Sequence, residues 1–247
     1  MRYLILSDIH ANLEALEAVL ADANPADFDR VILLGDLVGY GADPNAVIDR
    51  VKALQPFLMI RGNHDKVACG IEEPEGFNEA ARQAARWTYA ALGEANRRFL
   101  ADLPEGPAVV DGALEICHGS PEDEDTYIFE HIDALHALGS TLQPLCFFGH
   151  THVQIGYSLS AQIFDVVVPE TRGETSVSLT PGTRYIINPG SVGQPRDGDP
   201  RAAYATFDSA KQVVMLYRRP YDVLTAQRKI REAGLPEGLA RRLGVGK

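Results

Sequence analysis

The chain has few cysteines and no long apolar run. Its three cysteines, Cys69, Cys117 and Cys146, are widely spaced and form no C-x-x-C pair, which argues against a disulfide framework and favours reduced thiols in a cytoplasm. No stretch approaches the roughly 20 apolar residues that a membrane span requires, and the apolar run after Met1 is too short for a signal peptide. These absences predict a cytoplasmic protein that does not enter a membrane.

Basic residues are also in the minority, since 23 Lys and Arg stand against 34 Asp and Glu and the formal net charge is -11. Non-specific nucleic-acid binding is therefore not expected, because its affinity comes from cationic side chains that neutralise phosphates. The balance reverses in residues 218–247, which hold eight Lys and Arg against three Asp and Glu. A solvated helix face is the favoured interpretation of this segment, and docking on an acidic partner or on the protein's own body is the alternative. The residues concerned include Arg228, Lys229, Arg231, Arg241 and Arg242.

The length and the composition are those of one large domain. A chain of 247 residues with 45% hydrophobic residues can bury a sizeable core, and no repeat, low-complexity segment or linker divides it. We predict a single domain over residues 1–247, with 218–247 as a C-terminal helical extension packed on it. The sequence leaves the formation of a homo-oligomer open.

Short apolar segments alternate with amphipathic ones in the first half of the chain. This pattern predicts an α/β fold with a largely parallel arrangement of the early strands. Strands are expected at residues 3–6, 31–34, 57–60, 114–117 and 145–148, and helices from residue 12, over 44–54 and across 79–101. From residue 155 onward the pattern favours antiparallel strands at 155–159, 162–168, 176–179, 184–187, 202–207 and 213–217, followed by helices at 221–233 and 237–243.

A carboxylate, Asp36, follows the buried strand 31–34 directly. An isolated aspartate in this position favours a helix cap or a turn, but ligands in open α/β sheets bind at the carboxyl ends of strands. The other predicted strand ends also carry polar residues, namely Asp8, His10, Asn63, His64, His118, His150 and His152. The presence of these residues at neighbouring strand ends favours a metal cluster over a structural role for Asp36. Imidazole and carboxylate ligands without thiolate suit Mn, Fe, Zn or Co better than Mg or Ca.

Five motifs occur in a recognisable order: Asp8-x-His10, Gly35-Asp36, Gly62-Asn63-His64-Asp65, His118 and Gly149-His150-x-His152. In this order they closely resemble the five-block signature of the calcineurin-like metallophosphoesterases. The segment Ile-Asn-Pro-Gly-Ser-Val-Gly-Gln-Pro at residues 187–195 extends the resemblance to the small stand-alone bacterial and archaeal phosphodiesterase branch. The resemblance implies a four-layer α/β (α+β) sandwich of two mixed sheets flanked by helices, with two metal ions roughly 3.5 to 4 Å apart at one rim.

The resemblance also implies the role of each motif residue. It assigns Asp8, His10, Asp36 and His152 to the first metal ion and Asp36, Asn63, His118 and His150 to the second, so that Asp36 bridges two divalent ions, Mn, Fe or Zn. The site would then suit a small phosphate-ester substrate, because the ions carry more positive charge than the two carboxylates cancel. A hydroxide that bridges the metals would attack phosphorus, and His64 would stabilise the transition state or protonate the leaving group.

The second motif departs from the better-known relatives. Phosphoprotein and diadenosine tetraphosphate phosphatases continue it as G-D-x-V-[DN]-R-G, in which the arginine binds phosphate, whereas Tyr40 stands at the position of this arginine here. Gly39 replaces the acid that orients the catalytic histidine of phosphoprotein phosphatases, so Asp65 is expected either to orient His64 or to cap a helix. We therefore expect a phosphodiesterase, with Tyr40 as a candidate substrate contact. The alternatives are a phosphomonoesterase, a nucleotide or protein phosphatase, and a non-catalytic protein-binding scaffold; the intact ligand set and His64 oppose the scaffold.

Three further features have structural interpretations. The glycine-rich stretch at 190–193 lacks the Gly-Lys-Ser/Thr of a P-loop, which favours a turn over a role in lining the pocket. The acidic run 122–125 favours a solvated loop, although it could flank the site entrance. Trp87 is expected to pack on the sheet or over its edge, and His131 and His136 are expected to be structural.

Overall fold

The chain folds into two six-stranded sheets in the computed structural model, which describes residues 1–161, 163–170 and 173–247. The order of the first sheet is β3 (Leu58–Met59), β2 (Arg30–Leu33), β1 (Arg2–Leu6), β11 (Ala202–Asp208), β12 (Val213–Arg219) and β9 (Thr175–Ser178). The order of the second is β4 (Ala108–Val110), β5 (Leu114–Ile116), β6 (Leu145–Phe147), β10 (Thr183–Asn188), β7 (Ile155–Ser160) and β8 (Ile163–Val167). The first residue of the predicted strand 162–168, Gln162, lies outside the described residues.

Both sheets are mixed. The strands β1, β2 and β3 are parallel to one another, and so are β5, β6 and β10, whereas the remaining pairs are antiparallel. The late strands thus pair mainly antiparallel, as predicted, except that β10 runs parallel to β6. The short strand β4 was not predicted, because its central residue Val109 is exposed and its apolar run is only three residues long.

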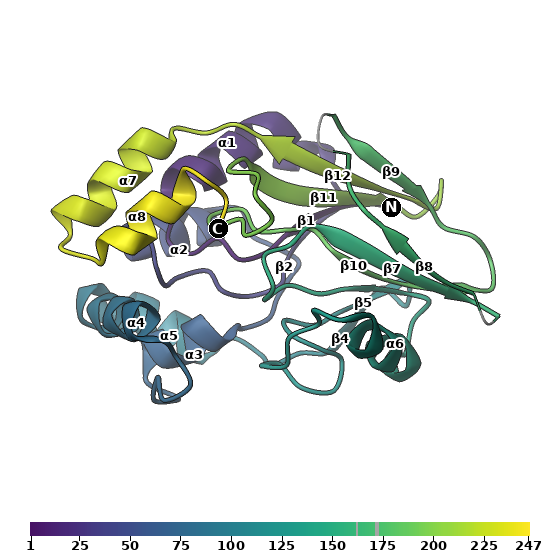
Figure 1. The fold of residues 1–247 in the computed structure, drawn as a ribbon, viewed down its shortest axis with the longest axis horizontal. Coiled ribbons are helices and arrows are strands. Elements are labelled where there is room, and N and C mark those ends of the chain that lie inside the picture. Colours follow the sequence, from purple (N-terminus) through teal and green to yellow (C-terminus); the bar gives the residue numbers. More distant parts are fainter. Residues whose placement is uncertain (162, 171–172) are drawn as a thin grey trace.

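Eight α-helices occur in the described part of the chain. They are α1 (Leu13–Ala23), α2 (Pro44–Ala53), α3 (Asn63–Cys69), α4 (Glu79–Ala91), α5 (Glu94–Ala101), α6 (His131–Ser140), α7 (Val223–Glu232) and α8 (Glu237–Leu243). Figure 1 shows α1 on the outer side of one sheet and α6 on the outer side of the other. This is the predicted layered sandwich of two mixed sheets flanked by helices.

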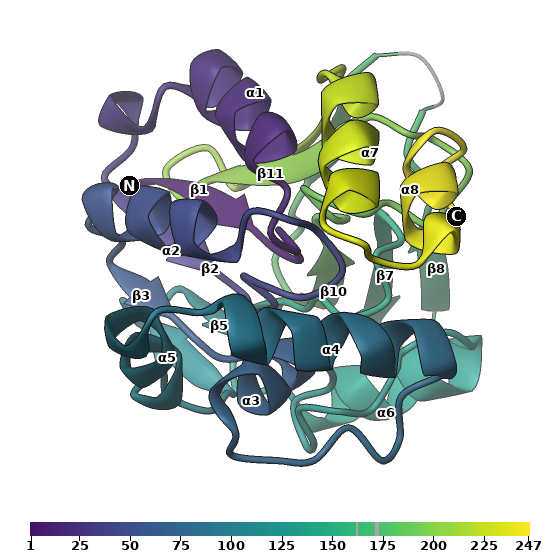
Figure 2. The ribbon, with the colours of Figure 1, turned by 90° about the vertical axis from the view of Figure 1, so that its left-hand side faces the viewer.

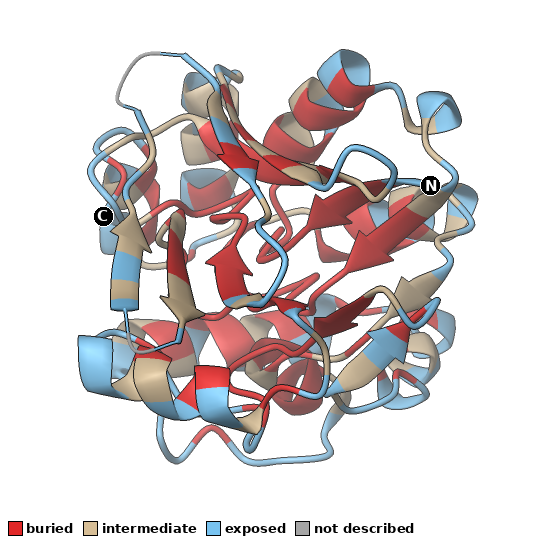
Figure 3. Cartoon of the chain, turned by 90° about the vertical axis from the view of Figure 1, so that its right-hand side faces the viewer, coloured by how far each residue is buried: buried red, intermediate tan, exposed pale blue. Residues whose placement is uncertain are grey.

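Alternation of side chains along each strand builds the layers. In β1, Tyr3 and Ile5 point into the core between the sheets, while Leu4 and Leu6 pack against α1 and α2 on the outer face. A strand that is covered on both faces must be apolar at every position, which explains the continuous apolar runs in the sequence. Figure 3 shows the resulting buried interior, in which the central strands are mostly red, whereas the edge strand β8 has only intermediate and exposed residues.

The two C-terminal helices pack against the body of the protein. Buried residues of α7 and α8, among them Ile230 and Leu239, cluster with Tyr40 and with α4. The sequence predicted that Trp87 packs on the sheet or over its edge, whereas it is partly buried against this helical cluster. Figure 2 shows α7 and α8 side by side near α1. None of the helices in the described ranges is both long and apolar enough to cross a membrane.

The favoured interpretation of the basic segment as a solvated face is wrong for part of it. Lys229 of α7 forms ion pairs with Glu14 at 2.5 Å and with Asp43 at 2.7 Å, so it binds the protein's own body. Arg228 and Arg241 do remain on the surface, with about 58% and 77% of their side chains exposed. The segment therefore combines a solvated face with a face that docks on the first half of the chain.

Candidate metal centre

The polar residues predicted at strand ends meet at one rim of the two sheets. Asp8 and His10 follow β1, Asp36 follows β2, and Asn63 and His64 open α3 directly after β3. His118 follows β5, and His150 and His152 follow β6. Because β1, β2 and β3 are parallel to one another, and β5 is parallel to β6, the carboxyl ends of the strands in each sheet point the same way.

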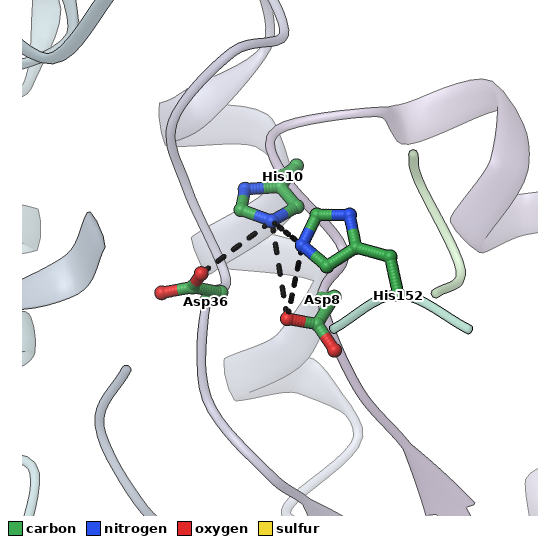
Figure 4. Close-up of side chains that lie close together, drawn as sticks. All are labelled: Asp8, His10, Asp36 and His152. Carbon is green, nitrogen blue, oxygen red and sulfur yellow. Dashed lines mark hydrogen bonds and ion pairs between the residues drawn. The ribbon is translucent and has the colours of Figure 1, made fainter. Parts of the chain in front are cut away.

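The metal-binding side chains form two buried groups. The first comprises Asp8, His10, Asp36 and His152, and the second comprises Asp36, His118 and His150; within each group the potential ligand atoms lie within 4.8 Å of one another. Figure 4 shows the first group, in which His10 Nε2 lies 2.9 Å from His152 Nε2 and His152 Nε2 lies 3.4 Å from Asp8 Oδ1. These atoms converge on a common point, as ligands of one ion do.

Asp36 belongs to both groups. Its Oδ2 atom lies 3.4 Å from His10 Nε2 in the first group and 3.5 Å from His118 Nε2 in the second. This oxygen is buried and accepts no hydrogen bond from the described residues, whereas Oδ1 accepts the backbone N–H of His64 at 2.9 Å. Asn63 Oδ1 lies 3.4 Å from His118 Nε2, which adds an amide oxygen to the second group.

Backbone carbonyls orient the histidine rings. The Nδ1 atoms of His10, His118 and His152 each lie 2.7 to 3.0 Å from a carbonyl oxygen, to which they can only donate, so Nε2 is left as the free ligand atom. His150 is turned the other way, because its Nε2 lies 3.1 Å from the carbonyl oxygen of Asp125, which leaves Nδ1 free. Each ring thus turns its other nitrogen toward the site, where that nitrogen can bind a metal ion once it is unprotonated.

The loops that carry these residues hold an unfavourable backbone conformation. Asp8, His10, Asp36, His150 and His152 all have positive φ angles, between 48° and 67°. Each such residue costs roughly 1 to 3 kcal/mol unless the surroundings enforce it, and such strain gathers at functional sites. The tight turns thereby aim five side chains at one point, and no sequence pattern identified these angles.

Close packing also explains one glycine of the signature. A Cβ atom on Gly62 would lie 2.2 Å from Asp36 Oδ1 and 2.7 Å from His118 Cε1. Only glycine lets the backbone after β3 approach the Asp36 carboxylate this closely.

Burial shifts the pKa values of the groups in this site. It raises the pKa of the Asp8 carboxyl to about 6 and lowers the pKa of His150 to about 3. Burial also opposes protonation of His118, but the Asp36 carboxylate outweighs this effect and raises the pKa of His118 to about 10. Conversely, although burial disfavours its charge, His118 holds the pKa of Asp36 well below its usual range. Without metal ions, Asp36 and His118 therefore hold each other in the charged form, while burial keeps the neighbouring His150 neutral.

His64 lies beside the ligands without joining either group. Its ring packs against Tyr40 and Phe77, with centroid distances of 4.3 and 4.5 Å, and burial lowers its pKa to about 4. A side chain at position 39 would collide with the ring, because a Cβ on Gly39 would lie 2.5 Å from His64 Nδ1. Asp65 does not orient His64, since its carboxylate accepts the backbone N–H groups of Gly62 and Val38. It is the helix cap that the sequence left as the alternative.

The acidic run 122–125 is only partly the solvated loop that was favoured, because Glu122, Asp123 and Asp125 are exposed whereas Glu124 is buried. Glu124 is only 9% exposed, and it pairs with Arg61 at 2.9 Å and with Lys66 at 3.0 Å. Asp125 pairs with Lys66 at 2.6 Å and accepts the hydrogen bond from His150 through its carbonyl oxygen. The run therefore flanks the site and supports one of its histidines.

A cavity of about 230 Å³ opens beside the second group of ligands. Its lining includes Asn63 and His150 together with the aromatic side chains of Phe77 and Tyr127. The Tyr127 ring stacks on His150 with a centroid distance of 3.8 Å and is 41% exposed. A bound molecule in this cavity would reach both a metal position and an aromatic wall.

The segment 187–195 packs against the loop that carries Asp8. Its residues 190–193, for which the sequence favoured a turn, lie outside regular secondary structure, and Gly193 also lines a cavity together with His10. Ser191 Oγ donates to the carbonyl oxygen of Asp8 at 2.7 Å, and Gly193 donates its N–H to the same oxygen at 3.0 Å. The carbonyl oxygen of Gln194 accepts the hydrogen bond from His152. Arg196, one residue beyond this segment, was missed, although its Nη2 atom donates to the Tyr40 hydroxyl at 3.2 Å.

Comparison with known proteins gives consistent matches. The chain matches the model of the calcineurin-like phosphoesterase superfamily domain over residues 1–212. It is 34% identical over 253 residues to an uncharacterized protein of Methanocaldococcus jannaschii, with 98% of this chain and 97% of the relative covered. A crystal structure of a metallophosphoesterase from Sphaerobacter thermophilus is similar with a TM-score of 0.86 and 40% identity, covering 100% of this chain and 99% of that one. A hypothetical protein from Pyrococcus horikoshii shares the fold, with a TM-score of 0.81, 19% identity and coverage of 100% and 98%.

Proposed function

Because the chain belongs to the calcineurin-like phosphoesterase superfamily and is a metallophosphoesterase, a phosphoric ester hydrolase, we propose that it hydrolyses phosphodiesters at a dinuclear centre. The observation that carries this proposal is the position of Asp36 Oδ2. This buried oxygen lies between His10 and His118, one from each ligand group, and has no hydrogen-bond donor among the described residues. A buried carboxylate oxygen without a donor is costly, and two cations would compensate it.

The residues present fit two divalent metal ions. Asp8, His10, Asp36 and His152 would hold the first ion, and Asp36, Asn63, His118 and His150 would hold the second. Four imidazoles and two carboxylates without thiolate favour Mn, Fe or Zn over Mg and Ca. When bound, the ions supply Lewis acidity, which lowers the pKa of a water nucleophile and neutralises charge on the phosphoryl oxygens.

His64 is proposed to act on the substrate directly. Its ring stands against His10 with a centroid distance of 5.0 Å, and the neighbouring Tyr40 and Phe77 rings restrict its orientation. A fixed imidazole nitrogen there would hydrogen-bond a phosphoryl oxygen or the leaving-group oxygen in the transition state. Tyr40 is proposed as a substrate contact through its position between His10 and His64.

A diester is favoured over a monoester because of the second motif. Tyr40 stands where related phosphatases carry a phosphate-binding arginine, and a diester has one negative charge fewer to neutralise than a monoester dianion. The cavity beside Asn63 and His150 offers the Phe77 and Tyr127 rings to the leaving group. A small ester with an apolar or aromatic leaving group fits this lining.

The proposal is tested by metal content and by hydrolysis of a matched pair of chromogenic esters. Purified protein loaded with Mn should contain two ions per chain and should hydrolyse bis(p-nitrophenyl) phosphate with a higher kcat/KM than p-nitrophenyl phosphate. His64→Ala should lower kcat by roughly 100-fold or more, the range for loss of a general acid or base, while both ions stay bound. His136→Ala, which changes an exposed histidine of α6, is the control. A preparation that never binds two ions would contradict the dinuclear mechanism. A higher kcat/KM for the monoester would contradict the proposed diester preference and favour a phosphomonoesterase.

A further inference from the structure

Two arginine side chains lie together beside the candidate metal centre, and neither pairs with a carboxylate of the residues that the structure describes. Arg196 Nη2 donates to Gln194 Oε1 at 3.0 Å, and Arg242 Nη1, from α8, donates to the same oxygen at 3.4 Å. Both guanidinium groups face the ring of Tyr40, at 5.5 and 5.9 Å from its centroid. Within residues 1–161, 163–170 and 173–247, neither arginine forms an ion pair.

This arrangement is electrostatically unfavourable in the protein alone. Like charges that share one site repel each other, and both burial and the neighbouring Arg196 lower the pKa of Arg242. Arg196 also has a buried Nε–H that finds no acceptor among the described residues. Two other partly buried arginines, Arg218 and Arg219, differ from this pair because each forms an ion pair with a carboxylate. An unused donor and two guanidinium groups without a direct carboxylate contact among the described residues are features of an anion site.

Aromatic rings connect the arginine pair with the two groups of ligands. Tyr40, which Arg196 contacts on one side, packs on His10 with a centroid distance of 4.7 Å. Arg196 also lies near Tyr127, whose ring stacks on His150, and its positive charge opposes the rise that burial causes in the pKa of the Tyr127 hydroxyl. Arg196 is therefore close to two aromatic rings that pack on one ligand histidine from each group.

We propose that Arg196 and Arg242 form an anion subsite that binds a second anionic group of the substrate, a phosphate or a carboxylate, while the scissile phosphoryl group lies at the dinuclear centre. The proposal rests on the proposed function. Both guanidinium groups and His10 lie against the Tyr40 ring, and neither arginine belongs to a group of potential metal ligands, so the pair would contact a group offset from the scissile phosphorus. Arg242 lies in α8, outside residues 1–212, which match the family model. The C-terminal helices therefore contribute one of the two arginines of this subsite.

The subsite can be tested without the metals. In metal-free protein the centre presents the carboxylates of Asp8 and Asp36 and repels phosphate, so inorganic phosphate should bind at the arginine pair. Isothermal titration calorimetry should detect this binding in the wild type, and Arg196→Gln or Arg242→Gln should weaken it by about tenfold or more, the loss expected for a charged hydrogen-bond donor. Arg241→Gln, which changes an exposed neighbour on the same helix, should bind phosphate as the wild type does. Wild-type protein that binds no phosphate, or variants that bind it equally well, would overturn the subsite.

A second measurement uses the Mn-loaded enzyme and identifies the anionic group. Ethyl phosphate, phosphoglycolate and methylenediphosphonate are compared as competitive inhibitors of bis(p-nitrophenyl) phosphate hydrolysis at one buffered Mn concentration. The first carries one anionic group, the second adds a carboxylate and the third a second phosphonate. At least one of the latter two should inhibit the wild type about tenfold more strongly than ethyl phosphate, and this ratio should approach one in Arg242→Gln.

Arg242→Lys separates charge from folding. Lysine retains the positive charge but not the planar guanidinium group, so Arg242→Lys should keep part of the preference for the inhibitors with two anionic groups. If a substitution at Arg242 acted only by disturbing α8, it would also lower the thermal stability of the protein. Equal inhibition ratios in wild type, Arg196→Gln and Arg242→Gln would overturn the proposal even if diester hydrolysis is normal. Absence of any hydrolysis, with phosphate still bound by the metal-free protein, would instead overturn the proposed function and leave the anion subsite standing.

Discussion

Replacing Asp36 by asparagine tests the bridging role most directly. The substitution keeps the size of the side chain and the acceptor for the His64 N–H, but it removes the charge of the oxygen between His10 and His118. Both proposed metal sites therefore lose the same ligand. Perturbed metal sites lose roughly 10- to 100-fold in affinity, which is about 1.4 to 2.7 kcal/mol for each ion.

The loss should be visible as stability. Metal binding to the folded state adds to the free energy of unfolding by mass action, so weaker binding of two ions removes about 3 to 5 kcal/mol of that contribution. At about 2 to 4 °C per kcal/mol for a chain of this size, the rise in Tm on adding Mn should shrink by roughly 6 to 20 °C. Asp36→Asn also removes the pairing of Asp36 with His118 in the metal-free protein, so the metal contribution is measured as the rise in Tm on adding Mn to each variant.

The assay combines calorimetric titration of Mn with thermal unfolding in the presence and absence of Mn. Asp102→Asn, which makes the same chemical change at an exposed position after α5, controls for the loss of one negative charge. The bridging role is refuted if Asp36→Asn binds two ions per chain with wild-type affinity. Loss of affinity for only one of two ions would show that Asp36 serves a single metal.

Three further predictions follow from the same geometry. Chelation with EDTA should lower Tm, and re-addition of Mn should restore it, as differential scanning calorimetry would show; an unchanged Tm would exclude bound structural metal. Gly62→Ala should destabilise the protein by about 3 kcal/mol or more in urea unfolding, because its Cβ would collide with Asp36, whereas Gly76→Ala meets nothing within 4 Å and should cost less than about 1 kcal/mol. Burial disfavours the charge of Glu124, but hydrogen bonds from Arg61 outweigh it and lower the pKa of this carboxyl. The stabilising contribution of the Glu124 carboxylate is therefore complete above about pH 4.3, the pKa of glutamate in the unfolded chain, and is lost as the pH falls further. In urea titrations of the metal-free proteins, the stability of Glu124→Gln should accordingly approach that of the wild type near about pH 3. A difference in stability that stays constant with pH would contradict this.

The sequence determined the strands and their polar ends. Continuous apolar runs such as residues 3–6 and 31–34 predict strands buried on both faces, and a polar residue just after each run can only lie at a strand end. This local information placed Asp8, Asp36 and His118 correctly at the rim of the sheets. It missed α3, which begins at Asn63, because a short helix that starts within a strand-end motif shows no periodicity of its own.

The tertiary structure decided which groups face one another. Contacts between distant segments, which sequence spacing does not encode, decide whether Asp65 caps a helix or orients His64. They also decide whether the basic C-terminal residues are solvated or packed on the body of the protein. The positive φ angles at Asp8 and Asp36 are of this kind as well, because the surrounding fold enforces them against local preference. The same holds for the arginine pair, since Arg196 and Arg242 come from separate parts of the chain. Local patterning specifies the elements and the chemistry of their ends, but only the packing of α8 against the Tyr40 ring brings a second arginine to the site.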